Sequence, residues 1–151
     1  WMPIVDWAMN MQIRRWNECL ITYILAASSA THSITPIVYQ QGWKGGSGYT
    51  NGNTYYGYPL PLGPNLGGPL FFSQYSFLGV NPFGLQEGGV NFEMQTKNHA
   101  LINYNYCKAN PLAHYGYSQL CWGLTASDIQ NGYTASSPLS LIHISEPTRP
   151  Y

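Results

Sequence analysis

The apolar positions between residues 12 and 29, QIRRWNECLITYILAASS, follow a helical pattern. They recur every three or four residues, which predicts an α-helix with an apolar face made of Ile13, Trp16, Leu20, Ile24 and Ala27. Ile21 and Leu25 fall on the opposite side, so the helix is apolar nearly all round. Such a helix is typical of one buried within a larger assembly of helices. The THS sequence and Pro36 end it.

The next thirty residues, 40–69, lose this periodicity. Gly, Pro, Asn and Tyr dominate the stretch QQGWKGGSGYTNGNTYYGYPLPLGPNLGGP. Either a long ordered loop or a disordered linker fits that composition. Flexible linkers are rarely so aromatic, and long loops inside a domain are usually functional, so the pattern favours a binding loop.

Helical signals return in two later segments. Residues 69–79, PLFFSQYSFLG, predict a short apolar helix with Pro at its start and Gly at its end. Residues 91–108 predict a longer helix with Asn91 as its N-cap, stopped by Asn110-Pro111. Its expected buried face is formed mostly by Phe92, Ala100, Leu101, Tyr104 and Cys107. The predicted fold class is therefore all-α, with helices joined by long aromatic loops.

Charged residues are unusually sparse, and this narrows the possible partners. They make up 8% of the chain, against roughly 25% in ordinary globular domains, and the net charge is zero. Nucleic acid is therefore not expected as a partner, because phosphate binding needs clustered Lys and Arg. No run of about 18 apolar residues occurs, so we expect no membrane segment. The chain begins at Trp1 without a signal-peptide pattern, so we interpret it as an internal part of something longer.

Aromatic residues are abundant instead, with 13 Tyr and 5 Trp. A neutral chain rich in Tyr, Trp, Asn and Gly suits an uncharged, hydroxyl-rich ligand such as a sugar, because aromatic faces cover the ring while amides and hydroxyls bond its edge. The alternative is an oligomer whose aromatic surfaces meet other subunits. The three cysteines have no metal-ligand spacing, so no zinc site is expected.

The residues from Leu139 onwards differ in character from the rest. The run LSLIHISEPTR resembles a direct translation of a transposase adaptor used in preparing sequencing libraries, since one codon for each residue reproduces that adaptor. We therefore expect residues 139–151 to be a non-native tail and residues 1–138 to be part of a natural domain. The alternative is a genuine flexible C-terminus. Glu146, His143 and Arg149 are left out of functional arguments for this reason.

Five carboxylates precede that tail, namely Asp6, Glu18, Glu87, Glu93 and Asp128. A glycosidase needs two, one as acid and one as base or nucleophile. Glu18 stands on the apolar helix, where a charge must be paired or functional. Arg14, one turn earlier, offers the structural ion pair. Arg15 and Asn17 are placed to orient a substrate hydroxyl or a carboxylate.

The other acids each have a structural alternative. Asp128 ends the turn sequence WGLTASD, where it either caps the following segment or takes part in catalysis. Glu87 lies in a Gly-rich turn, either as an ordinary exposed acid or as a catalytic group on a loop. Glu93 in the first helical turn is explained by the helix dipole. Asp6 lies too near the start to be judged, and the spacing of the histidines reveals no Ser–His–Asp arrangement.

Four blocks of sequence carry a resemblance to a known family. MQIRRWNECLITYILAASSATHSI, GGPLFFSQYSFLGVNPFGL, HALINYNYCKANP and YGYSQLCWGLTASD together resemble the glycoamylase-like family, which includes bacterial endo-β-1,2-glucanases and a domain of cyclic β-1,2-glucan synthases. The resemblance spans roughly residues 1–138. It implies part of an (α/α)6 barrel with a sugar cleft formed by long loops. It also implies hydrolysis of β-1,2-glucan with inversion and without a cofactor, in a periplasmic or secreted bacterial protein.

The resemblance also implies roles for particular residues. Glu18 in WNE, Glu87 after the GL turn and Asp128 in GLTASD match acidic site positions, with acid and base unassigned. Contacts to a glucan substrate would come from Arg15, Trp43, Tyr55, Tyr56, Gln74 and Trp122. Ser73 and Gln119 depart from the family pattern, because relatives often carry His and an acid there, and this leaves substrate specificity open.

Two other functions remain open from sequence. One is a non-catalytic carbohydrate-binding protein on the same scaffold, and the other is an α-glucan glucoamylase, which differs only in substrate. Part of a barrel leaves apolar helix faces uncovered, so we expect poor solubility and no catalysis from residues 1–151 alone.

Overall fold

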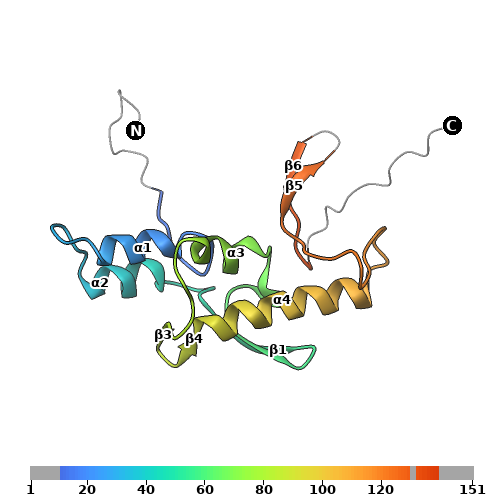
Figure 1. Cartoon of the computed structure of the whole chain (residues 1–151), viewed down its shortest axis with the longest axis horizontal. Helices are drawn as coiled ribbons and strands as arrows, with labels where there is room; N and C mark the ends of the chain where they lie inside the picture. The colour runs from blue at the N-terminus through green and yellow to red at the C-terminus, as the bar shows by residue number, and fades with distance from the viewer. Residues whose placement is uncertain (1–10, 130–131, 140–151) are drawn as a thin grey trace.

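The computed structural model describes residues 11–129 and 132–139 (Figure 1). Asp6 and the expected tail from residue 140 onwards lie outside the described residues. No helix in the described ranges is long and apolar enough to cross a membrane.

Short helices and β-hairpins alternate along the chain around one long helix. The first half contains α1 (Leu20–Ala27), α2 (Pro36–Val38), the π-helical turn η1 (Tyr39–Trp43), β1 (Thr50–Tyr55), β2 (Tyr58–Leu62) and the 3-10 turn η2 (Asn65–Gly67). The second half contains α3 (Phe71–Gln74), the 3-10 turn η3 (Tyr75–Leu78), β3 (Gln86–Glu87), β4 (Val90–Asn91), α4 (Phe92–Ala109), β5 (Ala126–Ile129) and β6 (Gly132–Ala135). Figure 1 shows α1, α3 and the β5–β6 hairpin on one side of α4, and the β1–β2 hairpin on the other.

The first helix is shorter than the sequence predicts. We expected it over residues 12–29, but α1 begins only at Leu20. Arg15 has a left-handed backbone with φ of 72°, and the Asn17 carboxamide oxygen accepts a hydrogen bond from the Cys19 N–H at 2.8 Å. Both features compete with helical geometry. Nor is α1 buried all round in the described structure, because Leu20 is its buried residue and Leu25 is 63% exposed.

The expected long loop at residues 40–69 is ordered, and it contains a β-hairpin. Strands β1 and β2 pair antiparallel, with Tyr55 opposite Tyr58 across a two-residue turn. Tyr56 and Gly57 occupy that turn with φ of 52° and 85°, as a type I′ turn requires. Leu60 and Leu62 are buried in β2. The sequence pattern did not predict this hairpin, because its turn is Tyr-Gly rather than Asn-Gly and because two prolines interrupt β2.

The two later helices form where the sequence predicts them. The segment 69–79 forms α3 followed directly by η3, and the segment 91–108 forms α4. The Asn91 side chain caps α4, because its oxygen accepts a hydrogen bond from the Met94 N–H at 3.0 Å. Asn110 ends the helix in a left-handed conformation, as a C-terminal Asn often does. The three hairpins β1–β2, β3–β4 and β5–β6 occupy segments that we expected to be loops.

The buried face of α4 differs from the predicted one. Ala100, Leu101 and Tyr104 are only half-buried, and the buried residues are Phe92, Gln95, Asn98, His99, Ile102, Asn103, Tyr106 and Cys107. They recur every three or four residues, so they share one face of the helix. Half of that face is polar. Hydrophobic periodicity alone therefore could not find it.

The polar side chains on this face of α4 bind the backbone of other segments. The Gln95 carboxamide both donates to the Leu62 carbonyl and accepts from the Leu62 N–H, each at 3.1 Å. Asn98 donates to the Pro59 carbonyl at 2.8 Å. The Asn103 oxygen accepts from the N–H groups of Gly123 and Leu124 at 3.2 and 3.0 Å. These bonds fix β2 and the approach to β5 on α4, and they satisfy backbone groups that burial would otherwise leave unpaired.

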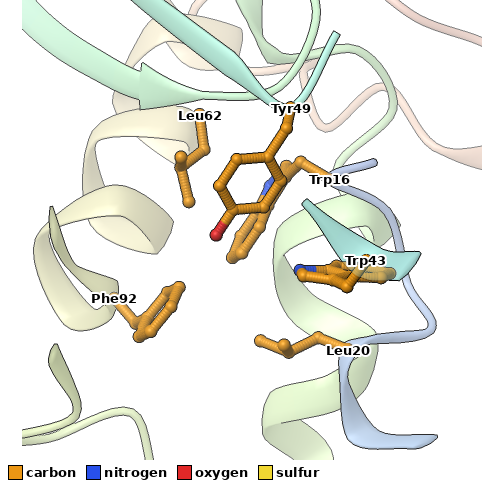
Figure 2. Close-up of a cluster of buried hydrophobic side chains, with 6 residues drawn as sticks. All are labelled: Trp16, Leu20, Trp43, Tyr49, Leu62 and Phe92. Atoms are coloured by element: carbon orange, nitrogen blue, oxygen red, sulfur yellow. The ribbon is translucent and has the colours of Figure 1, made fainter. Parts of the chain in front are cut away.

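The main apolar cluster joins segments that lie far apart in the sequence (Figure 2). Its buried members are Trp16, Leu20, Trp43, Tyr49, Leu62 and Phe92. Trp16 stacks on Phe92 with ring centroids 5.6 Å apart and meets Trp43 edge-on at 6.5 Å. The cluster therefore holds the turn before α1 against η1, β2 and the start of α4. A smaller cluster of Tyr106, Cys107 and Leu124 lies near the other end of α4.

Replacing Gln95 with Leu should be strongly destabilising. The change leaves the buried N–H and carbonyl of Leu62 without partners, so we expect a loss of about 3 kcal/mol in the free energy of unfolding. Urea unfolding of a full-length family protein that carries this sequence measures it. Glu93→Gln, at an exposed position two residues earlier, is the matched control. Equal losses from the two substitutions would contradict the bridging role of Gln95.

Candidate functional site

Glu18 lies in an irregular turn that is held from both sides. The Arg15 N–H donates to the Trp43 carbonyl at 2.8 Å, which attaches the turn to η1. On the other side, the Ser76 hydroxyl donates to the Glu18 carbonyl at 2.7 Å and accepts from the Ile21 N–H at 3.0 Å. One serine of η3 therefore clamps the residues on both sides of the start of α1. The backbone around Glu18 is therefore fixed by hydrogen bonds within the chain.

The carboxylate of Glu18 is partly buried and incompletely bonded. Its Oε2 atom is buried and has no hydrogen-bond partner in the described structure, and the same holds for Nε of Arg14. The Arg14–Glu18 ion pair that the helical spacing suggested does not form, because Arg14 and Glu18 are not on one regular helix. Burial, and then the negative charge of Glu18, raise the pKa of the neighbouring Cys19 thiol. An unsatisfied buried carboxylate oxygen is costly, so it calls for a partner beyond the described residues.

A buried chain of hydrogen bonds supports the residue two positions earlier. The Trp16 indole N–H donates to the Ser73 hydroxyl at 3.0 Å, and that hydroxyl lies 2.8 Å from Nδ1 of His99. Nε2 of His99 lies 3.1 Å from the Gly68 carbonyl, which can only accept. His99 therefore carries its proton on Nε2, and Nδ1 accepts from Ser73. Burial lowers the pKa of His99 to about 4, although the bond to Gly68 opposes the shift.

Glu87 is engaged in an ion pair. It ends β3, and its Oε1 lies 2.7 Å from Nζ of Lys44, with both side chains about one quarter exposed. Nζ of Lys44 also stands 5.6 Å from the centre of the Tyr49 ring. Glu87 therefore ties the β3 turn to the residue that follows η1. This contact gives Glu87 a structural role that its Gly-rich sequence context did not reveal.

Asp128 is an exposed residue of β5. It stands opposite Tyr133 of β6, which is 70% exposed. The expectation that Asp128 caps a following segment is wrong, because the residue lies within a strand of a hairpin. Since side chains alternate across a two-stranded sheet, Asp128 and Tyr133 share the face opposite to Ser127. Asp128 is thus presented on a projecting hairpin rather than held in the core.

The residues expected to contact sugar fall into three settings. Trp43 is fully buried in the aromatic cluster, and its ring packs on those of Trp16, Tyr23 and Tyr49. The Tyr55 hydroxyl is half-buried and bonds to Asn51 and Asn65. The remaining four are exposed on the described surface, namely Arg15, Tyr56, Gln74 and Trp122.

The candidates divide between two sides of α4. The turn before α1, the end of α3 and strand β5 carry Glu18, Gln74 and Asp128, and these elements share one side of α4 (Figure 1). The β1–β2 hairpin carries Tyr55 and Tyr56 on the other side. Glu87, on β3, precedes the first turn of α4. The elements that carry Glu18 and Asp128 therefore lie on one side of α4, but they attach to different parts of it. Trp16 and Leu20 pack with Phe92 at its start, and Gly123 and Leu124 bond to Asn103 further along. The β1–β2 hairpin with its tyrosines lies on the other side.

The described residues contain no group of three or more His, Cys, Asp or Glu side chains placed to hold a metal ion.

Comparison with known proteins matches this arrangement to one family. Residues 10–143 match the family model Glycoamylase, described as "Putative glucoamylase". The chain belongs to this glucoamylase-like family. A curated relative, the exo β-1,2-glucooligosaccharide sophorohydrolase (non-reducing end) of Parabacteroides distasonis, is 38% identical over 92% of the chain.

Solved structures are similar over about nine tenths of the chain. The endo-β-1,2-glucanase from Chitinophaga pinensis, in complex with sophorotriose and glucose, is 43% identical with a TM-score of 0.83 over 91% of the chain. The β-1,2-glucanase from Parabacteroides distasonis is 38% identical with a TM-score of 0.85 over 92% of the chain. The chain spans 22% of the curated relative and of the Parabacteroides structure and 34% of the Chitinophaga structure.

Sequence reasoning missed the supporting role of two serines behind the Glu18 turn and Trp16. Ser76 clamps the Glu18 turn, and Ser73 joins Trp16 to His99. The spacing of Ser73 and Ser76, three residues apart on one helical face, was the available signal. It could not be interpreted alone, because their partners lie more than twenty residues away in the chain.

Acidification should destabilise the family domain through His99. The folded pKa is about 4 and the ordinary value is 6.5, so the unfolded state takes up the proton first. The contribution is complete above pH 6.5 and is lost as the pH falls toward 4, by about 3 kcal/mol in all. Unfolding free energies of wild type and His99→Gln, measured from pH 7 to pH 4, should fall more steeply for wild type. Parallel curves would exclude His99 as the source.

Proposed function

We propose that this chain is part of a glycoside hydrolase that cleaves β-1,2-linked glucan and that Glu18 is one of its two catalytic carboxyl groups. The observation that carries the proposal is the buried, unpartnered Oε2 of Glu18, on a backbone clamped by Ser76. The relatives are named for action on β-1,2-linked glucose chains, and we take the proposed substrate from them. Low charge and abundant aromatic residues suit that uncharged ligand.

The proposed chemistry needs only carboxyl groups and water. One carboxylic acid protonates the glycosidic oxygen as its bond to the anomeric carbon breaks. The other carboxylate takes a proton from the water that attacks the opposite face of the sugar. This inverting arrangement places the two carboxyl groups roughly 6.5–9.5 Å apart, with the water between the base and the sugar. The fixed turn around Glu18 suits either role, because both demand a preorganised group.

Asp128 is the proposed second acidic residue of the site within this chain. It is exposed on the β5–β6 hairpin, and Tyr133 opposite it in β6 offers an aromatic surface to a sugar ring. Glu87 is a weaker candidate than the sequence suggested, because its carboxylate is already neutralised by Lys44. Substrate contacts are proposed for the exposed Arg15, Gln74 and Trp122, with Tyr55 and Tyr56 on a more distant loop.

The finer fold is also a proposal, namely that the chain contributes part of an (α/α)6 barrel. The helices α1 and α4 with long connecting segments supply the expected ingredients. The exposed apolar side chains of Leu25, Ile37 and Leu78 suit faces that pack against further helices.

Glu18→Gln should remove the activity while keeping the fold. We expect kcat on β-1,2-glucan to fall by a factor of about 10³ or more, because glutamine preserves the shape but cannot exchange a proton. Reducing-sugar release by a full-length family protein carrying this sequence measures the change. Asp128→Asn should also reduce kcat, whereas Glu87→Gln should change it less than either.

The matched control is Glu93→Gln, at an exposed position in the first turn of α4. It should retain wild-type kcat. Activity that survives Glu18→Gln would remove Glu18 from catalysis. Glucan binding without hydrolysis would favour a non-catalytic capture protein, and cleavage of starch but not β-1,2-glucan would replace the proposed substrate.

A further inference from the structure

The N-terminus of α1 takes its cap from another segment of the chain. Cys19 stands at the N-cap position, and its side chain makes no capping hydrogen bond. The first N–H groups of a helix have no partner within the helix, so they need acceptors from elsewhere. The Ile21 N–H, in the first turn of α1, donates to the Ser76 hydroxyl at 3.0 Å, across 55 positions of sequence. The segments fit closely here, because a side-chain carbon on Gly79 would lie 2.9 Å from Cδ1 of Ile21.

The same hydroxyl also holds the peptide that follows Glu18. A serine hydroxyl has one proton to donate, and Ser76 donates it to the Glu18 carbonyl at 2.7 Å. That carbonyl belongs to the peptide between Glu18 and Cys19, so its direction sets the ψ angle of Glu18. The ψ angle in turn sets the direction of the Glu18 Cα–Cβ bond relative to α1. One hydroxyl therefore links the start of α1 with the direction in which the carboxylate leaves the backbone.

The N–H side of this peptide is held within the turn itself. The Cys19 N–H donates to the Asn17 carboxamide oxygen at 2.8 Å, and the Asn17 amide donates to the Arg14 carbonyl at 3.0 Å. These bonds join residues two and three positions apart, so they fix the shape of the turn but move with it. The bond from Ser76 reaches the peptide from a distant element instead. The placement of Glu18 against η3 therefore depends on Ser76.

We infer that Ser76 is a positioning residue of the proposed hydrolase, which holds the Glu18 carboxyl group in its reactive orientation without touching the substrate. The inference rests on the proposed function for the role of Glu18. Ser76 is 2% exposed, and its hydroxyl bonds backbone groups on both sides of the start of α1. A misplacement of about 1 Å in a catalytic group can cost a factor of about 10² in rate. The contribution of Ser76 therefore lies in kcat, and KM stays near its wild-type value.

Steady-state kinetics on β-1,2-glucan, with a full-length family protein carrying this sequence, measure this contribution. Ser76→Ala should lower kcat about tenfold to a hundredfold and change KM by less than about twofold. Ser76→Cys keeps nearly the same size but offers only a weak donor and acceptor, so its kcat should lie between those of Ser76→Ala and wild type.

Thr96→Val is the matched control. The Thr96 hydroxyl donates to the Ser73 carbonyl at 3.1 Å, so this change removes the same kind of hydroxyl–carbonyl bond at a distance from Glu18. It should keep kcat within about twofold of wild type, because it does not alter the Glu18 peptide.

A double-mutant cycle separates positioning from general destabilisation. If Ser76 acts through the Glu18 carboxyl group, Ser76→Ala should cost nothing further in a Glu18→Gln background, because the group that it positions is already lost. Thermal unfolding of each variant ensures that folded proteins are compared at the assay temperature.

The outcomes distinguish this inference from the proposed function. Wild-type kcat in Ser76→Ala or, where that variant does not fold, in Ser76→Cys would overturn the inference and leave the proposed function intact. An equal loss from Ser76→Ala in the wild-type and Glu18→Gln backgrounds would do the same, as would a comparable loss from Thr96→Val. Full activity of Glu18→Gln would reject both the catalytic role of Glu18 and the positioning role of Ser76.

Discussion

The hydrogen bonds between the polar face of α4 and the backbone of its neighbours are the interaction on which the rest of this structure depends. Gln95 pairs with the N–H and the carbonyl of Leu62, as a neighbouring strand would. The Asn103 oxygen accepts hydrogen bonds from two N–H groups before β5. Irregular segments carry many unpaired backbone groups, and burying them is costly without partners. A helix with side-chain amides on its buried face solves this problem for several segments at once.

These side-chain hydrogen bonds explain how a chain with little regular secondary structure holds its loops in fixed positions. The β1–β2 hairpin and the Trp122 turn are both anchored to α4 through Asn or Gln, while the Glu18 turn is anchored to α3 and η3 through Ser73 and Ser76. The aromatic cluster around Trp16 then closes the space between these anchored segments. The candidate site residues of this chain thus lie largely on irregular segments, and side-chain hydrogen bonds hold these segments on the helices.

His99 illustrates how closely the segments fit around α4. A side-chain carbon built on Gly67 would lie 2.1 Å from Cδ2 of His99, so only glycine fits against the imidazole. The φ of 92° at Gly67 imposes the same choice independently. Because the imidazole fills this space and bonds on both sides, it stays neutral and joins η2 to α3. The buried Ser73–His99 contact is therefore part of the scaffold of this site.

The sequence by itself determined the helix at 91–108 with its Asn91 cap, the short helical segment at 69–79, the family and the short list of acids. These features rest on local signals, namely cap residues, periodicity and contiguous blocks of residues. Only the tertiary structure decided which of these segments and side chains contact one another. The Tyr-Gly hairpin, the Lys44–Glu87 pair and the polar face of α4 depend on contacts between residues that are distant in the chain. Hydrophobic periodicity predicts burial only when the buried face is apolar. The buried face of α4 is half polar, and its polar side chains bind backbone groups of other segments. For the same reason the sequence offered Glu18 a pair with Arg14 and offered Glu87 no partner, whereas in the structure Glu87 pairs with Lys44 and Oε2 of Glu18 has no partner among the described residues.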